Sequence, residues 1–257
     1  NAGLSNTTGT ALSAFGQSAG QANTTGFANT AMGVSALSAN TTASYNTAIG
    51  YQSLTANTTG TSNTAFGEGS LKANTTADNN TAMGRLALAA TTTGAANTAV
   101  GYASQQTLVG GFNNTSLGFL SLYVSTASNN TAVGHTSLMG NTTGTGVTAV
   151  GMQSGRFNTT GSQNTYLGIN AGYNNTTANN NTAIGADAFY ANTTGAQNTA
   201  IGRLALKRNT TASGNTAVGY NASASGSTGA SNTSMGHSAL ASNQTGSSNT
   251  AVGRQAL

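Results

Sequence analysis

A glycine recurs along the whole chain at a fixed interval of 17 residues. The series runs from Gly16 to Gly253, and its single deviation is the 16-residue step from Gly118 to Gly134. Coils are numbered 1 to 15 after these framing glycines. Written from its first asparagine, the unit reads N-T-A-h-G-x-x-A-L-x-A-N-T-T-G-x-x, where h is a large apolar residue. Such regular self-similarity is the signature of a repeat architecture, so we expect one repeat domain spanning residues 1–257.

Some positions of the unit are restricted and others vary freely. The residue before each framing glycine is apolar in all fifteen copies, and the third residue after it is always Ala or Ser. The first two residues after the glycine vary among polar, charged and aromatic types. We therefore expect the restricted positions to be packed and the variable positions to face outward.

The length and content of the unit favour strands over helices. Helical repeats have periods of about 33 to 45 residues and carry long apolar stripes. Here short apolar segments are punctuated by Gly and Asn, a pattern that is typical of strands and corners. The expected fold class is all-β, a parallel β-solenoid (β-roll) of about fifteen 17-residue coils. Successive coils would stack at the strand spacing of about 4.8 Å.

Two asparagines recur in almost every coil and are expected to form buried ladders. An Asn amide can donate to one neighbouring coil while its carbonyl oxygen accepts from the other. One ladder would run through Asn29, Asn46, Asn63, Asn80 and Asn97, and the other through Asn23, Asn40, Asn57 and Asn74. The framing glycine would allow a positive φ or a close approach between coils. The chain contains no proline, which fits a ladder that needs every backbone donor.

The T-A-h and A-L segments are restricted at adjacent positions. Because side chains alternate between the two faces of a strand, restriction on both faces predicts that one face packs in the coil interior and the other against a second chain. We therefore expect a parallel homotrimer. The chain starts and stops within a coil without a polar cap, which also predicts a longer fibre or end-to-end stacking into a filament.

Charged residues are too few and too scattered for most other functions. Seven Lys or Arg face three Asp or Glu, so no basic stripe for nucleic acid is expected, and no run of about 18 apolar residues predicts membrane insertion. His135, Asp187 and His237 would lie roughly 14 Å apart in successive pairs, too far for a triad or a metal site. A glycan-cleaving spike needs paired carboxylates, and the other acids are Glu68 and Asp78. We expect no enzyme, no catalytic residue, no cofactor and no metal.

Stacking also makes specific predictions about neighbours. Glu68 and Arg85 occupy the same repeat position in coils 4 and 5, so we expect them to form an exposed pair. The N-T-T triplets match acceptors for N-linked sugars, but their regularity favours ladder-forming corners.

One region departs from the repeat. Coil 6 replaces its N-T-T-G corner with Leu108–Gly111, and coil 7 loses a residue within 123–126. Nearby outward positions become apolar, as a contact surface requires. The alternative is that Phe157 and Tyr173 fill the space left where Gly155 and Gly172 replace the usual Leu. The candidate contact patch comprises Tyr102, Phe119, Tyr123, Met139, Met152, Phe157, Ile169, Tyr173 and Tyr190.

The units Asn46–Gly50 and Asn181–Gly185 both read N-T-A-I-G and are followed by x-x-Ala or x-x-Ser. They resemble the repeats of YadA-like heads in trimeric autotransporter adhesins and the related repeats of bacteriophage tail fibres. The resemblance covers all fifteen coils. It implies a left-handed parallel β-roll, three chains around one axis and attachment to surfaces. The expected function is a structural or adhesive fibre segment, located outside the cell, on the cell surface or on a virion, with a cell-surface or glycan receptor as a possible partner.

An ice-binding protein is the main alternative function. Ladders of Thr and Asn on a β-solenoid of low charge would suit ice if the threonines formed a flat array facing water. A fibre shaft would be inert in an ice-recrystallisation assay, so that assay separates the two hypotheses.

Overall fold

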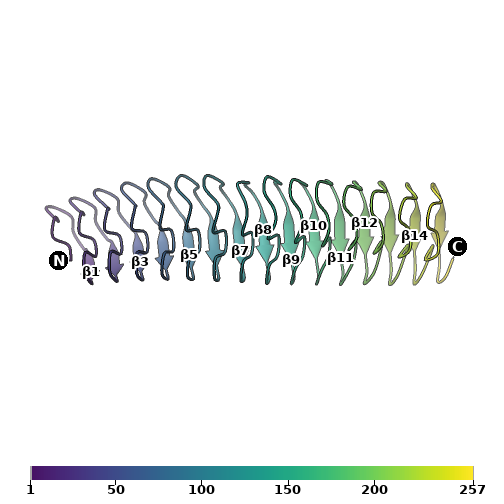
Figure 1. Ribbon diagram of the computed structural model, residues 1–257, viewed down its shortest axis with the longest axis horizontal. Coiled ribbons are helices and arrows are strands. Elements are labelled where there is room, and N and C mark those ends of the chain that lie inside the picture. The colour runs from purple at the N-terminus through teal and green to yellow at the C-terminus, as the bar shows by residue number, and fades with distance from the viewer. Residues whose placement is uncertain (1, 257) are drawn as a thin grey trace. The chain divides into compact units, whose positions relative to one another are not determined.

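The computed structural model describes residues 2–256, and within them it contains fifteen three-residue strands and no helix. The expected fold class is confirmed: the chain is an all-β parallel β-solenoid in which each coil contributes one strand (Figure 1). Two compact units divide the chain, unit 1 at Asn1–Ser128 and unit 2 at Asn129–Leu257.

Unit 1 contains seven parallel strands that pair in sequence order. They are β1 (Ser13–Phe15), β2 (Thr30–Met32), β3 (Thr47–Ile49), β4 (Thr64–Phe66), β5 (Thr81–Met83), β6 (Thr98–Val100) and β7 (Thr115–Leu117).

Unit 2 contains eight parallel strands that also pair in sequence order. They are β8 (Thr131–Val133), β9 (Thr148–Val150), β10 (Thr165–Leu167), β11 (Thr182–Ile184), β12 (Thr199–Ile201), β13 (Thr216–Val218), β14 (Thr233–Met235) and β15 (Thr250–Val252).

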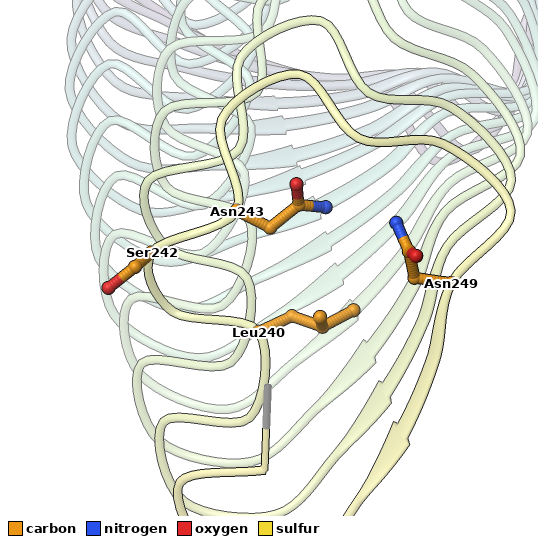
Figure 2. Close-up of a pocket in the computed structure, with 4 residues that line it drawn as sticks. All are labelled: Leu240, Ser242, Asn243 and Asn249. Carbon is orange, nitrogen blue, oxygen red and sulfur yellow. The ribbon is translucent and has the colours of Figure 1, made fainter.

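Within each unit, the strand pairs are in register with the sequence repeat. Thr47 pairs with Thr64, for example, and each residue of β3 meets its own equivalent in β4. This register turns a repeat position into a column of side chains. Figure 2 shows one coil: Leu240 points into the interior, Asn243 and Asn249 face each other across one corner, and Ser242 points outward.

The interior is a thin core of alanine and leucine. In each regular coil of unit 1, the middle strand residue and the Ala-Leu pair that follows the framing glycine are buried, as at Ala48, Ala36 and Leu37. The expectation that one residue of the A-L pair faces a second chain is therefore wrong. Leu37 and Ser35 both have positive φ, which breaks the two-residue alternation of a strand, so Ala36 and Leu37 are both buried.

The framing glycine is required for two reasons. Gly50 has a φ of +130°, which L residues rarely adopt, and a β-carbon at this position would lie 2.7 Å from the carbonyl carbon of Gly67 in the next coil. A side chain would therefore both strain the backbone and separate the coils. The expected role of these glycines is confirmed.

The two asparagine ladders are also confirmed, and they differ in their bonding. In the corner ladder, Asn57 Nδ2 donates to Asn40 Oδ1 at 3.0 Å and to a carbonyl of its own corner. In the ladder that precedes the strands, Asn46 Oδ1 instead accepts from the backbone amide of Asn63 at 3.0 Å, and Asn63 Nδ2 donates to a carbonyl. Both arrangements satisfy most buried amide groups of the ladders without water; Asn74 Oδ1 and Asn181 Nδ2 are the ladder atoms buried without a partner among the described residues.

A further regularity spans two coils. From Gly26 to Gly94 the residue after the corner triplet alternates between Gly and Ala, and a polar side chain follows each Ala. Thr61 N donates to Asp78 Oδ1 at 2.6 Å, and Phe27 N donates to Ser44 Oγ at 3.1 Å. A β-carbon on Gly60 would lie 2.6 Å from Asn57 Oδ1. Alternate coils therefore make complementary contacts at this corner.

Where one core residue changes, a second change accompanies it. Gln105 replaces a leucine, and its Nε2 donates to Oγ of Ser116, which replaces the alanine of β7, at 2.7 Å. Ser223 replaces another leucine and donates to Oγ of Ser234 at 3.1 Å. In both pairs the buried polar groups bond to each other.

An aromatic version of this exchange occurs in β10. Tyr166 replaces the strand alanine and is fully buried, while glycines replace leucine in coils 9 and 10. A β-carbon on Gly155 would lie 2.7 Å from Cδ2 of the Tyr166 ring, and one on Gly172 would also overlap the ring. The suggestion that Phe157 and Tyr173 fill this space is therefore wrong, because the inward-pointing Tyr166 already occupies it.

Candidate interaction surface

Titratable residues are dispersed over the structure. The described residues contain no group of three or more His, Cys, Asp or Glu side chains that could hold a metal ion. His135 and His237 each follow a framing glycine and are exposed, and Asp187 accepts a hydrogen bond from Asn170 Nδ2 at 3.0 Å. Residues 2–256 include no helix long and apolar enough to cross a membrane.

A column of large apolar residues runs along the outer face of the strands. We call the residues immediately before the framing glycines the outer apolar column. The strand residue before each of them points inward, as at the fully buried Ala65, whereas Phe66 is 51% exposed. The exposed members are Phe15, Met32, Phe66, Met83 and Leu117 in unit 1, and Leu167, Ile201, Met235 and Val252 in unit 2. The middle residue of T-A-h thus packs in the interior of the coil, and the large apolar residue lies on its outer surface.

Threonines lie beside this column but do not form a uniform hydroxyl array. The first strand residue, as in Thr64, shares the outer face with the large apolar side chains. At the N-T-T corner, Thr58 Oγ1 donates to the carbonyl oxygen of Thr75 at 3.1 Å, and Thr75 repeats this bond to Thr92. These corner hydroxyls donate their protons to hydrogen bonds between neighbouring coils.

The part of the candidate contact patch in unit 1 is a short aromatic stack. Tyr102 and Phe119 stack with ring centroids 5.3 Å apart and an interplanar angle of 15°. The Arg85 guanidinium lies 5.7 Å from the centre of the Tyr102 ring, and Arg85 Nε lies 3.0 Å from Glu68 Oε2. The predicted Glu68–Arg85 pair is therefore confirmed, and its hydrogen bond and charge raise the pKa of Arg85. Tyr123 belongs to another column and is half-buried.

The part of the patch in unit 2 occupies two faces of the coil. Met152 and Ile169 are exposed directly after their framing glycines. Tyr173 and Tyr190 stack at 5.0 Å with an interplanar angle of 6°, and Phe157 meets Tyr173 edge-on at 5.1 Å. The remaining member, Met139, is half-buried, as are both tyrosines.

This geometry limits how the patch can bind. One face of Tyr173 stacks on Tyr190, Phe157 meets Tyr173 edge-on, and Arg156 lies 6.0 Å from the centre of the Tyr173 ring. A ligand at Tyr173 would therefore meet mainly the edge of its ring and its hydroxyl group. The nine predicted residues form separate columns and stacks within the units.

Apart from the exposed Asn6, the N-T-T asparagines are buried and are not available to carry sugars in this fold. Asn57, Asn158 and Asn192 are fully buried, and their Nδ2 atoms donate to neighbouring asparagines and to backbone carbonyls. An attached sugar would remove these bonds and could not fit between coils.

A hollow of about 300 Å³ lies at the last coils, lined by Leu240, Ser242, Asn243 and Asn249 (Figure 2). Its walls are repeat positions that elsewhere contact the adjacent coil. The hollow is therefore an uncovered portion of the solenoid interior.

Comparison with known protein families, curated proteins and solved structures finds no match to this chain.

Proposed function

We propose that this chain is a structural and adhesive fibre segment that self-associates through its outer apolar column and functions outside the cell, on a cell surface or on a virion. The observation that carries the proposal is the outer apolar column, which has one large apolar residue in every strand of each unit; nine of these side chains are exposed and the others are half-buried. Contiguous exposed apolar surface of this kind is typical of protein contacts.

A second copy of the same chain is the partner that fits this surface best. The column repeats once per coil, so a matching partner needs the same spacing along its length. A parallel copy has that spacing, and rotational symmetry would place equivalent columns against each other. Three chains around one axis agree with the adhesin heads and tail fibres that the repeats resemble.

Native mass measurement of the purified chain tests the proposal. We expect a trimer, and we expect the double variant Phe66→Lys/Met83→Lys to dissociate because it places two charges on the apolar column. The control Thr59→Lys/Thr76→Lys adds the same charge at exposed corner positions and should remain trimeric. A folded wild-type monomer would overturn the proposal.

We favour the fibre over ice binding because of the side chains that share the strand face. An ice-binding array requires flat, regularly spaced threonines, whereas Thr64 and Thr81 lie beside the protruding Phe66 and Met83. We expect no inhibition of ice recrystallisation by the soluble assembly. Strong inhibition would instead support the ice-binding alternative.

A further inference from the structure

The net charge of the chain is concentrated in one unit. Unit 1 contains two basic and two acidic residues, which cancel, whereas unit 2 contains five Lys or Arg and only Asp187 as an acid. The formal net charge of +4 therefore belongs entirely to unit 2. No acidic side chain follows Asp187 in the sequence.

Four of the five basic residues of unit 2 lie in coils 12 to 15. Arg203, Lys207 and Arg208 belong to coil 12, and Arg254 follows the framing glycine of coil 15. Arg203, Arg208 and Arg254 are exposed and Lys207 is half-exposed. Within the described residues none of the four forms an ion pair; the ion pair seen there, Glu68–Arg85, lies in unit 1. Their charges are available to an external anion.

Aromatic contacts order the column of residues that directly follow the framing glycines in coils 12 to 14. The Arg203 guanidinium lies 5.7 Å from the centre of the Tyr220 ring, and Tyr220 stacks on His237 at 5.1 Å. The backbone N–H of Asn221 donates to the backbone carbonyl of Arg203 at 3.0 Å, which keeps the two coils in register. Packing a guanidinium on an aromatic face reduces its freedom, so less entropy is lost when it binds a ligand.

We propose that coils 12 to 15 bind an acidic carbohydrate polymer through the column of exposed residues that directly follow the framing glycines, Arg203, Tyr220, His237 and Arg254, which we call the basic surface. This rests on the proposed attachment function and names the class of receptor. The surface extends over four coils at about 4.8 Å per coil, so it suits an extended ligand with repeated negative groups. Carboxylate or sulfate groups would pair with the two guanidinium groups.

Other ligand classes fit the basic surface less well. A neutral sugar needs an open aromatic face for stacking, but the Tyr220 ring contacts Arg203 and His237. Affinity for duplex DNA rises with the number of phosphates that Lys and Arg side chains neutralise, whereas this surface provides two arginines. The charge complementarity and the low cation density favour an acidic polysaccharide.

Binding of the full chain to polygalacturonate tests this proposal, with neutral dextran and duplex DNA as comparison ligands. We expect binding to polygalacturonate that weakens with salt. The variant Arg203→Gln/Arg254→Gln should lose affinity by roughly 10-fold or more. The matched control Lys72→Gln/Arg85→Gln removes the same charge from unit 1 and should bind within about twofold of the wild type, because the Debye length is only about 10 Å.

The native mass of each variant is measured alongside binding, so a change in assembly is distinguished from loss of the basic surface. Wild-type assembly with no polygalacturonate binding would overturn this inference and leave the self-association proposal intact. Equal losses in the two variants would overturn it by showing a general charge effect. Equal binding to dextran, or tighter binding to DNA at the same anion concentration, would also overturn it.

Discussion

The ring of Tyr166 occupies the space next to Gly155 that a side chain on Gly155 would need: a β-carbon on Gly155 would lie 2.7 Å from the ring. Tyr166 replaces a strand alanine, and Gly155 and Gly172 replace leucines in the same part of the core. The side chains of different coils thus share one interior volume. A large residue is accommodated at one position because neighbouring positions are empty.

The first prediction tests this exchange of volume. Tyr166→Ala should destabilise the chain by about 3 to 5 kcal/mol because it leaves a cavity. Adding Gly155→Leu and Gly172→Leu should recover a large part of that loss, since Leu37 and Leu54 adopt the same positive φ in regular coils. Thermal and denaturant unfolding measure the effect. The two leucines introduced without Tyr166→Ala should be strongly destabilising, and the idea fails if they are tolerated.

The second prediction concerns the Tyr166 hydroxyl, which is buried without a hydrogen-bond partner. Burial raises the pKa of Tyr166 well above its ordinary value of 10.0. The unfolded chain therefore loses this proton first, and stability should fall as the pH rises above about 10. Tyr166→Phe should gain about 1 kcal/mol at neutral pH and lose less stability at high pH. The control is Tyr190→Phe on the surface, and similar alkaline unfolding of both variants would contradict the prediction.

The third prediction repairs an interruption of the corner ladder. Gly226 occupies the repeat position that is Asn209 in the preceding coil and Asn243 in the following coil. A β-carbon there would lie 3.3 Å from the Asn243 carbonyl oxygen, so a side chain needs only a small local shift. The Gly226→Asn variant should have a free energy of unfolding about 1 to 2 kcal/mol higher than the Gly226→Ala variant, because the new Asn side chain can form ladder hydrogen bonds. Equal stability of the two variants would show that the ladder is not restored.

The fourth prediction measures an intact ladder. Asn57 Nδ2 donates to Asn40 Oδ1, and Asn57 Oδ1 accepts from Asn74 Nδ2 at 2.8 Å. Asn57→Ala therefore removes one hydrogen bond from each of these two buried neighbours. We expect a loss of about 2 kcal/mol or more. Thr59→Ala at an exposed corner position should change stability by less than about 0.5 kcal/mol. Similar values for the two variants, measured by denaturant unfolding, would argue against a stabilising ladder.

The fifth prediction tests the aromatic contact patch. Replacing Tyr102, Phe119 and Tyr173 with Ser should abolish sedimentation of the assembly with bacterial cells while leaving most of its thermal stability. Aromatic rings commonly carry the binding energy of a contact. The control Tyr45→Ser/Tyr51→Ser changes exposed rings in other coils and should sediment normally. Retained attachment with a lowered melting temperature would assign the rings of the patch to stability.

The sequence by itself determined the coil, its register and the columns. In-register stacking places each residue against its own equivalent, so a repeat count is enough to predict the Asn40–Asn57 bond and the Glu68–Arg85 pair, both found at 3.0 Å. The need for glycine at Gly50 follows equally from the repeat. No backbone torsion has to be known for these contacts.

Only the tertiary structure decided which faces of the coil point inward. The positive φ of Leu37 buries both residues of the A-L pair, against the alternation that an extended strand predicts. The structure also showed that Tyr166, rather than Phe157 or Tyr173, fills the space beside Gly155. The reason is physical: alternation depends on backbone torsions, and core filling depends on side chains that meet across the coil, neither of which follows from the period.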